Sequence, residues 1–537
     1  MASRKIVFVA FQDQPNLGIG YMASVLLGER FDVEVLDFRL GSREILERIQ
    51  KADPLLVGFS VIFQYYTPEY ADLASYLRDH SVTCLLCAGG HYPSLQYEEA
   101  LDLMRDVDCV VRFEGEDTLT EIAHRLSEGR DWRDVRSIAY RADGRIVATP
   151  LRPLIADLDR LPFPKRWNFD YQCLGIRVTS LLASRGCVRN CAFCSIRRFY
   201  SIPPGGGLRR TRSPGNVLDE MLELYRDHDV RIFLFQDDDF SMMSPRDRDW
   251  VEGFLDRLAR TEMAGSIMWK ISCRADEIEE RLFRKLKAAG MWLAYLGIES
   301  GNGEGLRVLN KQISVEQNRR AIGLLKDLGV RYDFGFMLFD PSSTFATVRE
   351  NVRFLREICL DGSATASFGK TLPYAGTDLE RQMRREGRLS GDVSTPNYRF
   401  SEDRVEAWFG YLCEVFCPWV DGDQCLQAQL RWSLFESEVL MRFHGKIPGI
   451  RKYVDVLAYL VHWYNTIFCN IVEDSAEIFE REGGYGSDGL EALKAAAERQ
   501  RLWIEDQLAS QRKAFFTKTR IPLELIIGTV DESRTAG

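Results

Sequence analysis

The sequence predicts an α/β protein in three parts: a doubly wound Rossmann-like domain, a partial (β/α)6 barrel and a helical C-terminal domain. Three observations predict it. Strand and helix patterns alternate over residues 1–131, the alternation restarts over 176–385 after a proline-rich connector, and residues 386–537 show helical periodicity. A chain of 537 residues is also too long to form a single hydrophobic core.

The first region alternates short β-rich runs with helical segments. Strands separated by helices form a parallel sheet, which binds ligands at the carboxyl ends of its strands. We expect strands at 5–10, 31–37, 55–60, 83–88 and 109–112, with helices at 20–28 and 70–78.

Glycine, polar and acidic residues follow these strands. Glycine lets a backbone approach a bulky ligand closely, although glycine-rich loops alone are weak evidence and fit nucleotide-type or response-regulator-type domains as well. The candidate ligand-binding residues are Gly18, Ser60, Gly89, Gly90, His91, Glu114, Gly115, Glu116 and Thr118.

Residues 132–175 are expected to link the two α/β regions. They contain a short strand pair around residues 142–145 and end in an extended, proline-punctuated segment. The second region then predicts a helix at 216–227 and six strands, a number that suggests a parallel barrel with its chemistry at the strand ends. The strands are expected at 178–183, 231–235, 268–272, 293–298, 332–338 and 366–372.

Cys187, Cys191 and Cys194 follow the first of these strands with the spacing Cys-x-x-x-Cys-x-x-Cys. Three thiolates on so short a loop can ligate three irons of a 4Fe-4S cluster, which leaves the fourth iron open for an outside ligand. A zinc site or three unrelated cysteines are the alternatives. Zinc is disfavoured because no histidine or second cysteine pair lies nearby in the sequence.

The cysteine spacing, Gly186 before it and Phe193 inside it resemble the radical S-adenosylmethionine superfamily. Together with the preceding domain, and with Gly-Gly-His at 89–91 and Glu-Gly-Glu-Asp-Thr at 114–118, the chain resembles the cobalamin-dependent branch over residues 1 to about 385. The resemblance implies three cofactors: a 4Fe-4S cluster, S-adenosylmethionine and cobalamin. It also implies that Phe193 lies against the cofactors.

The sequence departs from cobalamin domains that carry Asp-x-His-x-x-Gly, whose histidine ligates cobalt. No such motif occurs here, and relatives in the radical family commonly lack it. The lower axial ligand therefore stays open, and His91 is interpreted as a loop histidine that hydrogen-bonds a ligand or water.

Polar residues at the barrel strand ends suit S-adenosylmethionine. The run Asp237 to Asp239 resembles the family segment that accepts the cofactor's ammonium, with Asp237 and Asp238 as candidates and a solvated acidic turn as the alternative. Arg274 suits the cofactor carboxylate, with a surface salt bridge as the alternative. Glu299 and Ser300 are expected to bind ribose hydroxyls or the ammonium. No side chain is required as a general base.

The C-terminal region carries no motif and is expected to cover the barrel mouth, with helices at 380–387, 423–444, 453–482 and 489–517. Cys413, Cys417 and Cys425 have an aromatic setting and do not match auxiliary-cluster patterns, which disfavours a second cluster. The uncharged stretch 456–472 contains four polar residues and predicts a buried helix instead of a membrane span.

The amino-acid composition limits the classes of partner and substrate that we expect. A net charge of -9 and the lack of a basic patch disfavour nucleic acid, and favour a small-molecule or peptide substrate. Thirteen cysteines and an N-terminus without signal-peptide character indicate a cytoplasmic protein with reduced thiols.

The resemblance implies an enzyme that cleaves S-adenosylmethionine reductively to a 5'-deoxyadenosyl radical, using an external electron donor such as flavodoxin or ferredoxin. It further predicts methylation of an unactivated carbon in a natural-product intermediate. A cobalamin-dependent rearrangement, cyclisation or other non-methyl transfer, and a radical enzyme without cobalamin, remain open. A non-catalytic cobalamin or iron-sulfur sensor is disfavoured because no output domain or DNA-binding motif is present. A transfer-RNA methylthiotransferase is disfavoured because the basic RNA-binding tail and the second tri-cysteine domain are missing.

Overall fold

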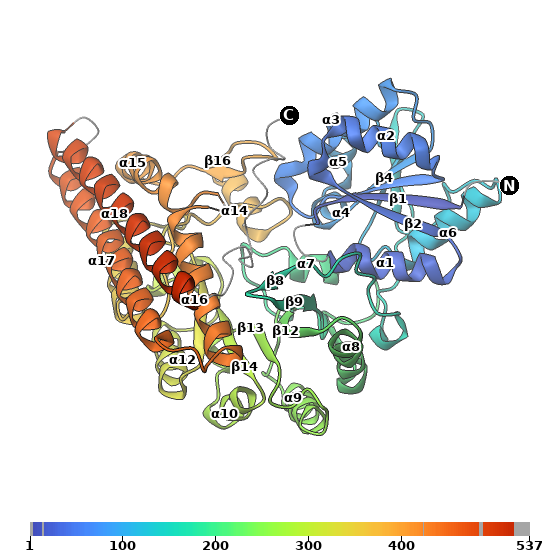
Figure 1. Ribbon diagram of the computed structural model, residues 1–537. Helices are drawn as coiled ribbons and strands as arrows, with labels where there is room; N and C mark the ends of the chain where they lie inside the picture. Colours follow the sequence, from blue (N-terminus) through green and yellow to red (C-terminus); the bar gives the residue numbers. More distant parts are fainter. Residues whose placement is uncertain (1–3, 13–15, 423, 483–486, 520–537) are drawn as a thin grey trace.

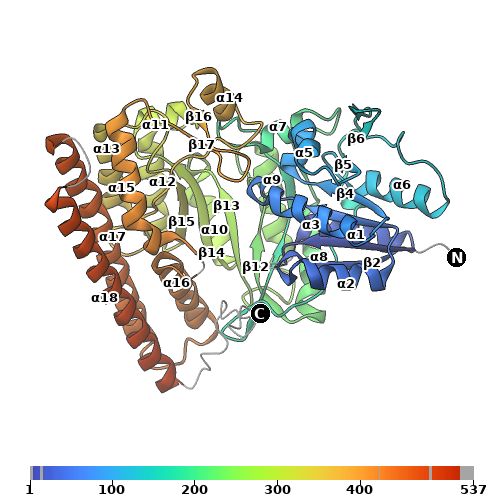
Figure 2. The same cartoon turned by 90° about the horizontal axis from the view of Figure 1, so that it is seen from above.

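The computed structural model describes residues 4–12, 16–422, 424–482 and 487–519. Figure 1 shows two α/β regions and a set of long helices. The N-terminal α/β domain and the C-terminal helices lie on opposite sides of the second sheet, as Figure 2 also shows from above. The doubly wound domain, the partial barrel and the helical region predicted from the sequence are confirmed.

The N-terminal sheet has seven strands in the order β2-β1-β3-β4-β5-β6-β7, of which β1 to β5 run parallel. Apolar clusters cover both faces, one under α1 and α6 and the other under α2 and α3. The strands are β1 (Lys5–Ala10), β2 (Asp32–Asp37), β3 (Leu56–Ser60), β4 (Leu85–Gly89), β5 (Cys109–Val111), β6 (Ile138–Ala142) and β7 (Arg145–Ala148). The helices are α1 (Leu17–Gly28), α2 (Ser42–Ala52), α3 (Thr67–Asp79), α4 (His91–Leu95), α5 (Tyr97–Leu103) and α6 (Glu116–Ser127).

The strand pair expected around residues 142–145 is present as β6 and β7, and it continues the first sheet. β6 pairs antiparallel with β5, so that Val111 lies opposite Ile138. Because an edge strand offers unpaired backbone groups, this hairpin extends the sheet instead of standing free in the linker.

The barrel sheet has the order β15-β14-β13-β12-β9-β8. Five strands are parallel: β9 (Ile176–Leu181), β12 (Val230–Phe235), β13 (Met268–Cys273), β14 (Met291–Glu299) and β15 (Arg331–Phe336). The two-residue β8 (Gln172–Cys173) pairs antiparallel at one edge. The helices that connect or follow these strands are α8 (Pro214–Asp227), α9 (Pro245–Leu258), α10 (Glu280–Ala288), α11 (Gly303–Val308), α12 (Val315–Leu328) and, after the last strand, α13 (Phe345–Cys359).

The sixth barrel strand predicted at residues 366–372 is wrong as a strand. Only an isolated parallel bridge between Phe339 and Lys370 remains of it. The backbone of Ala366 is bonded to helices instead, because its N–H donates to Asn465 and its carbonyl accepts from Gln427. Side chains of α16 and α17 thus replace a strand ladder here.

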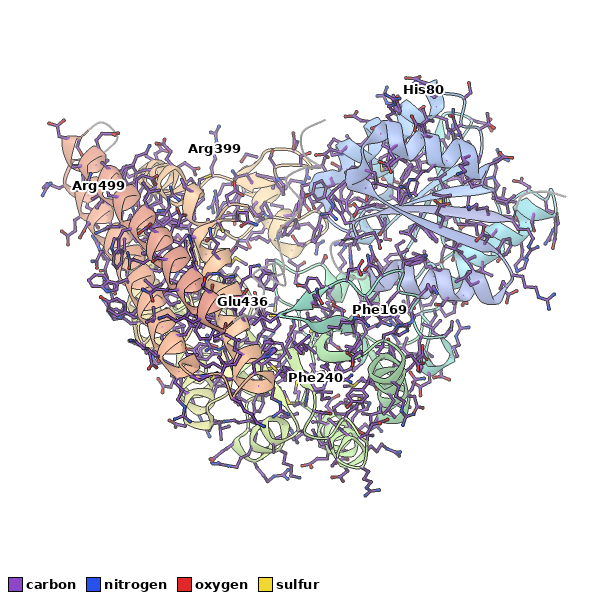
Figure 3. The ribbon with its side chains drawn as sticks, viewed as in Figure 1. His80, Phe169, Phe240, Arg399, Glu436 and Arg499 are labelled. Carbon is purple, nitrogen blue, oxygen red and sulfur yellow. The ribbon has the colours of Figure 1, made fainter. Side chains whose placement is uncertain are left out.

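The C-terminal region contains α14 (Asp378–Arg385), β16 (Leu389–Ser390), β17 (Asn397–Tyr398), α15 (Asp403–Val420), α16 (Leu426–Phe443), α17 (Ile450–Glu482) and α18 (Asp488–Thr519). Four of these helices match the predicted ones to within a few residues, although Asp423, the expected start of one, lies outside the described residues. Glu436 of α16, labelled in Figure 3, is buried. It accepts hydrogen bonds from Arg512 of α18. This buried ion pair joins two of the long helices.

The apolar stretch 456–472 lies inside α17 and contributes buried residues to the largest core. Its Asn465 is fully buried and donates to the carbonyls of Cys359 and Ala364. In the described part of the chain, no helix combines the length and apolarity that crossing a bilayer requires.

Candidate active site

The three motif cysteines lie on the loop between β10 (Ser184–Gly186) and α7 (Ile196–Ser201). Backbone hydrogen bonds hold the loop on both sides: Ala192 N–H donates to Leu309 at 2.9 Å, and Leu379 N–H donates to Ala192 at 2.8 Å. All three thiols are partly accessible. The fold therefore presents three thiols on a rigid loop at the carboxyl end of the barrel.

Burial is the main cause of the raised pKa values of two of the three thiols. It raises the pKa of Cys187 to about 12, with the Asp239 carboxylate adding to the shift, and raises the pKa of Cys194 to about 11. Arg274 and Lys311 interact electrostatically with Cys191. Positive side chains beside the cysteine loop offset the negative charge of a thiolate-ligated centre.

The three aspartates after β12 have different surroundings. Asp237 accepts from Ala183 N–H at 3.1 Å and from the Ser184 hydroxyl at 2.5 Å. Asp238 accepts from Gly186 N–H at 2.8 Å. Asp239 approaches the Cys187 thiol with one oxygen, and its buried Oδ1 has no hydrogen-bond partner among the described residues.

Arg274 lies one residue beyond β13 with one donor unused. Its Nε and Nη2 donate to Asp276, and Nη2 also donates to the carbonyl of Lys311. The buried Nη1 has no partner among the described residues. An unpaired guanidinium donor and the unpaired carboxylate oxygen of Asp239 therefore lie near the cysteine loop.

Glu299 is the last residue of β14 and Ser300 follows it, and the two buried side chains have different partners. Glu299 has a positive φ of 65° and accepts from Lys311 at 3.0 Å. Ser300 is fully buried, and its hydroxyl is bonded to Asn302 and Asn351. Ser300 thus supports the loop, whereas Glu299 and Lys311 form a buried ion pair beside the cysteines. Phe193 is partly buried against the barrel core.

A pocket with a volume of about 340 Å³ lies between the N-terminal domain and the barrel. It is bounded by eight of the nine N-terminal candidates: Gly18, Ser60, Gly89, Gly90, His91, Glu114, Gly115 and Glu116. Leu182, Ser184, Arg185, Phe199, Tyr200, Gln236 and Asp238 of the barrel region complete it. We call this cavity the interface pocket.

Gly89 and Gly90 of the interface pocket differ in what a larger residue would meet there. A Cβ at Gly89 would meet only the carbonyl oxygen of Val111, at 3.5 Å, so the backbone leaves room for a larger group where Gly89 lines the pocket. Gly90 has a φ of +132°, and a Cβ there would lie 2.0 Å from the carbonyl of Val61. Gly90 is therefore required by the loop itself.

His91 lines the interface pocket, with its ring centroid 4.5 Å from that of Phe199. Burial lowers the pKa of His91 to about 4, so the imidazole is neutral at physiological pH. A neutral imidazole can accept or donate a hydrogen bond.

Glu114, Glu116 and Thr118 have partners within the protein. Glu114 accepts from Arg185 at 3.0 Å and from Arg210 at 2.9 Å, and Glu116 accepts from Arg185 at 2.6 Å. Thr118 lies outside the pocket lining and accepts from Arg152. The two glutamates therefore connect the domains.

The other cysteine group lies on the C-terminal helices. Cys417 is exposed and its thiol contacts Asp421, whereas Cys425 is buried and accepts from Ala428 N–H. Over the described ranges, no three His, Cys, Asp or Glu side chains surround a point that would hold a single metal ion.

Comparison with known families matches each α/β region separately. The B12 binding domain family matches residues 3–123, and the radical SAM superfamily matches residues 181–355. The chain is a cobalamin-dependent radical S-adenosylmethionine enzyme. Enzymes of this kind use cobalamin, a 4Fe-4S cluster and S-adenosylmethionine.

Two curated relatives of this radical S-adenosylmethionine enzyme differ in activity. An uncharacterised methyltransferase of Pyrococcus horikoshii is 28% identical over 379 residues, 68% of this chain and 77% of the relative. The anaerobic magnesium-protoporphyrin IX monomethyl ester cyclase of Rubrivivax gelatinosus is 29% identical over 386 residues, 69% of this chain and 66% of the cyclase.

Solved structures share the whole fold of the radical S-adenosylmethionine enzyme. The cobalamin-dependent enzyme OxsB, with aqua-cobalamin bound, has a TM-score of 0.69 at 18% identity and covers 96% of this chain and 81% of its own. The methyltransferase TsrM from Kitasatospora setae, with cobalamin and a [4Fe-4S] cluster bound, has a TM-score of 0.64 at 15% identity, covering 95% and 99%.

The residues present fit these cofactors. Three thiols suit a cluster with one open iron, and the unpaired Arg274 Nη1 and Asp239 Oδ1 suit a carboxylate and an ammonium. In the interface pocket, the buried Nδ2 of Asn16 has no partner among the described residues, and Gly89 leaves room for a ligand.

Sequence reasoning did not select Asn16, Tyr200, Asp239 or Lys311 as site residues. Asp239 belongs to the recognised acidic run, so that run was a usable signal. Asn16 begins the glycine-containing segment that follows the first strand, so that segment was a usable signal as well. Tyr200 and Lys311 lie outside the recognised motifs, and only the fold brings them to the site.

Proposed function

We propose that this enzyme methylates an unactivated carbon of a small molecule or peptide. The observation that carries the proposal is the interface pocket, where strand ends of the B12 domain meet Asp238 and the segment that leads into Cys187. When bound, the cluster and S-adenosylmethionine supply a 5'-deoxyadenosyl radical, and cobalamin supplies the methyl group. The chain's own residues bind these groups, orient them and exclude water.

We assign the cluster to Cys187, Cys191 and Cys194. We assign the carboxylate of S-adenosylmethionine to Arg274 and its ammonium to Asp239, supported by their unpaired buried atoms. Asp238 and Glu299 border the same region, and Phe193 lies within the cysteine loop. Asp237 is a weaker candidate for the ammonium because both its oxygens already accept hydrogen bonds.

The cobalamin assignment rests on the interface pocket. Gly18 and Gly89 give the ligand room, Ser60 and Gly115 line the walls, and neutral His91 is available as a hydrogen-bonding side chain. Asn16 supplies an unpaired amide donor. In this proposal Gly90, Glu114, Glu116 and Thr118 shape the pocket through their contacts within the protein.

Three further statements belong to this proposal. The domains extend over 1–131, 176–385 and 386–537 with the linker at 132–175, except that β6 and β7 (138–148) join the first sheet and β8 (172–173) joins the barrel sheet. An external one-electron donor such as flavodoxin or ferredoxin supplies the reducing equivalents. The protein is cytoplasmic, which agrees with thirteen cysteines that form no disulfide.

The methyltransferase relative favours methylation, whereas the cyclase relative supports a second candidate, cobalamin-dependent cyclisation or another non-methyl transfer. Stoichiometry separates the two. Methylation consumes two molecules of S-adenosylmethionine for each product and yields one 5'-deoxyadenosine and one S-adenosylhomocysteine. Cyclisation needs only the molecule that gives 5'-deoxyadenosine.

The test supplies methyl-labelled S-adenosylmethionine to the reduced holoenzyme with metabolite extract from a strain that lacks the gene. We expect S-adenosylhomocysteine to accumulate in step with 5'-deoxyadenosine and label to enter one product. Product without label, and 5'-deoxyadenosine without S-adenosylhomocysteine, would favour the second candidate. The Cys191→Ala protein is the matched control and should form neither nucleoside product.

A further inference from the structure

A second cavity, of about 480 Å³, lies inside the barrel between the sheet and helix α16. We call it the barrel cavity. Its strand side is formed by Leu234, Lys270, Leu293 and Asp333, and its helix side by Gln427, Arg431, Trp432 and Phe435. This volume falls in the range of small-molecule sites. None of the motif residues lies in it.

The barrel cavity adjoins the interface pocket. Gln236, directly after β12, lines both cavities, and its amide donates to Ser180 of β9. A molecule in the barrel cavity therefore has one end near Gln236, beside the strand ends where Asp238 and the cysteine loop lie. The position of the barrel cavity allows a substrate bound there to extend toward the cofactor sites.

The lining of the barrel cavity has an excess of positive charge. Its charged residues are Lys270, Asp333 and Arg431, and Arg431 pairs with Asp333 at 3.0 Å. This pair leaves Lys270 as the surplus cation. In the described part of the chain no carboxylate forms an ion pair with Lys270, whose ammonium donates only to the Ser272 hydroxyl at 3.1 Å. A lysine ammonium has three donors, so donors remain for a ligand.

Other charged side chains affect the electrostatics around Lys270. Asp237 and Asp333 both interact electrostatically with Lys270, but neither forms an ion pair with it, and the oxygens of Asp237 already accept hydrogen bonds from Ala183 and Ser184. The buried Nε of Arg431 has no partner among the described residues. The cavity thus contains two cationic groups with unused donors, a combination that is costly unless an anion binds.

Aromatic rings from both sides line the cavity: Trp292 lies on β14, and Trp432 and Phe435 lie on α16. The rings of Trp292 and Phe435 lie 5.4 Å apart, and those of Trp432 and Phe435 lie 6.0 Å apart. Flat apolar groups pack well against such rings. The cavity therefore combines a cation on each side, Lys270 of β13 and Arg431 of α16, with aromatic rings from β14 and α16.

We propose that the barrel cavity binds the substrate, a small molecule with an apolar, ring-sized body and a carboxylate or phosphate that Lys270 binds. The inference rests on the proposed function, because it places the reacting carbon toward Gln236 and the cofactors. Four residues of strand separate Lys270 from Arg274, roughly 13 Å at the usual rise. A molecule of that length, anchored at Lys270, reaches the strand ends.

The test measures binding of three probes to the reconstituted holoenzyme by ligand-observed NMR titration, without reductant. Phenylacetate and phenyl phosphate carry the two anions, and phenylacetamide is the neutral analogue. We expect at least one anion to bind at least tenfold more tightly than phenylacetamide, and whichever anion binds more tightly identifies the anionic group. Lys270→Met should weaken anion binding at least tenfold, whereas Lys270→Arg should retain most of it.

The matched control is Lys285→Met, a surface change on α10 that should leave all affinities unchanged. Trp292→Ala should weaken all three probes alike, and iron and cobalamin content verify that each variant is folded. Equal binding of the anions and the amide, or unchanged anion binding in Lys270→Met, would overturn the inference. If labelled product still forms in that case, the proposed methylation stands and only the substrate site is wrong. If anions bind as expected but no label enters the product, the substrate site stands and the proposed methylation is wrong.

Discussion

Arg185 donates to Glu116 at 2.6 Å across the boundary between the barrel and the N-terminal domain. Arg185 is two residues before Cys187, and Glu116 is the first residue of α6. The side chains of Arg185 and Glu116 are 11% and 5% exposed, so the pair is largely shielded from water. The cysteine loop and the interface pocket are therefore mechanically connected.

Arg185→Met should destabilise the protein by about 3 to 5 kcal/mol, because it leaves the buried carboxylates of Glu114 and Glu116 without this partner. The control is Arg160→Met, which removes an exposed pair with Asp117, whose two side chains are 48% and 43% exposed. That change should cost less than about 1 kcal/mol. Calorimetric unfolding of the apo proteins compares the two, and equal losses would contradict the connecting role of Arg185.

Changing Cys187, Cys191 or Cys194 to Ala should abolish the cluster and all formation of 5'-deoxyadenosine, because one tri-cysteine loop holds the ligands. The anaerobically reconstituted parent should contain about four irons per chain. Iron analysis and nucleoside chromatography measure both effects. Cys417→Ala is the control and should keep the full iron content, whereas loss of about half the iron would indicate a second cluster.

Gly89→Leu should reduce retention of hydroxocobalamin at least tenfold while the absorption of the cluster stays unchanged. A Cβ at this position meets only one backbone atom within 4 Å, and Gly89 lines the interface pocket, so a leucine there should fill space that the ligand needs. Gly28→Leu is the control, since it lies at the end of α1 and outside the pocket lining. Equal cobalamin retention in the Gly89 variant and the parent would exclude Gly89 from the cobalamin site.

Arg274→Gln should weaken the binding of S-adenosylmethionine by roughly 10-fold to 100-fold, the range for a lost hydrogen bond to a charged group. Equilibrium dialysis against the labelled cofactor measures the affinity at constant iron content. Arg281→Gln, an exposed residue on α10 paired with Glu252, is the control. Unchanged affinity in the Arg274 variant would remove Arg274 from the cofactor site.

Asp237→Asn should alter the pH dependence of stability. Burial raises the pKa of Asp237 to about 6 from its ordinary 3.8, despite hydrogen bonds from Ser184 and Ala183. Between about pH 4 and pH 6 the folded state keeps a proton that the unfolded state has released, so stability falls as pH rises through this window. Two pKa units correspond to roughly 3 kcal/mol.

The measurement compares the melting temperatures of the parent and Asp237→Asn apo proteins at pH 5 and pH 7.5. The parent should lose stability relative to the variant as the pH rises, and the difference should be constant above about pH 7. A difference that does not change with pH would contradict a raised pKa at Asp237.

Periodicity and motif spacing predicted most of the fold because both are local properties of the chain. The strand alternation located β1 to β5 and the five parallel barrel strands, and the cysteine spacing located one compact loop. The strand expected at 366–372 failed for a tertiary reason: α16 and α17 supply the hydrogen-bond partners of Ala366, and only the bridge of Lys370 to Phe339 remains. An apolar run cannot reveal which partner its backbone meets.

By itself, the sequence determined the order of the domains, the tri-cysteine loop and the glycines at the strand ends, since these follow from residue type and spacing. Only the tertiary structure decided which carboxylates remain unpaired. It joined Glu116 to Arg185, bonded Asp237 within the fold and left an oxygen of Asp239 unpaired. It also brought Lys270 and Arg431, 161 residues apart, to one cavity. The charge balance of a site depends on contacts between distant residues, which no local pattern encodes.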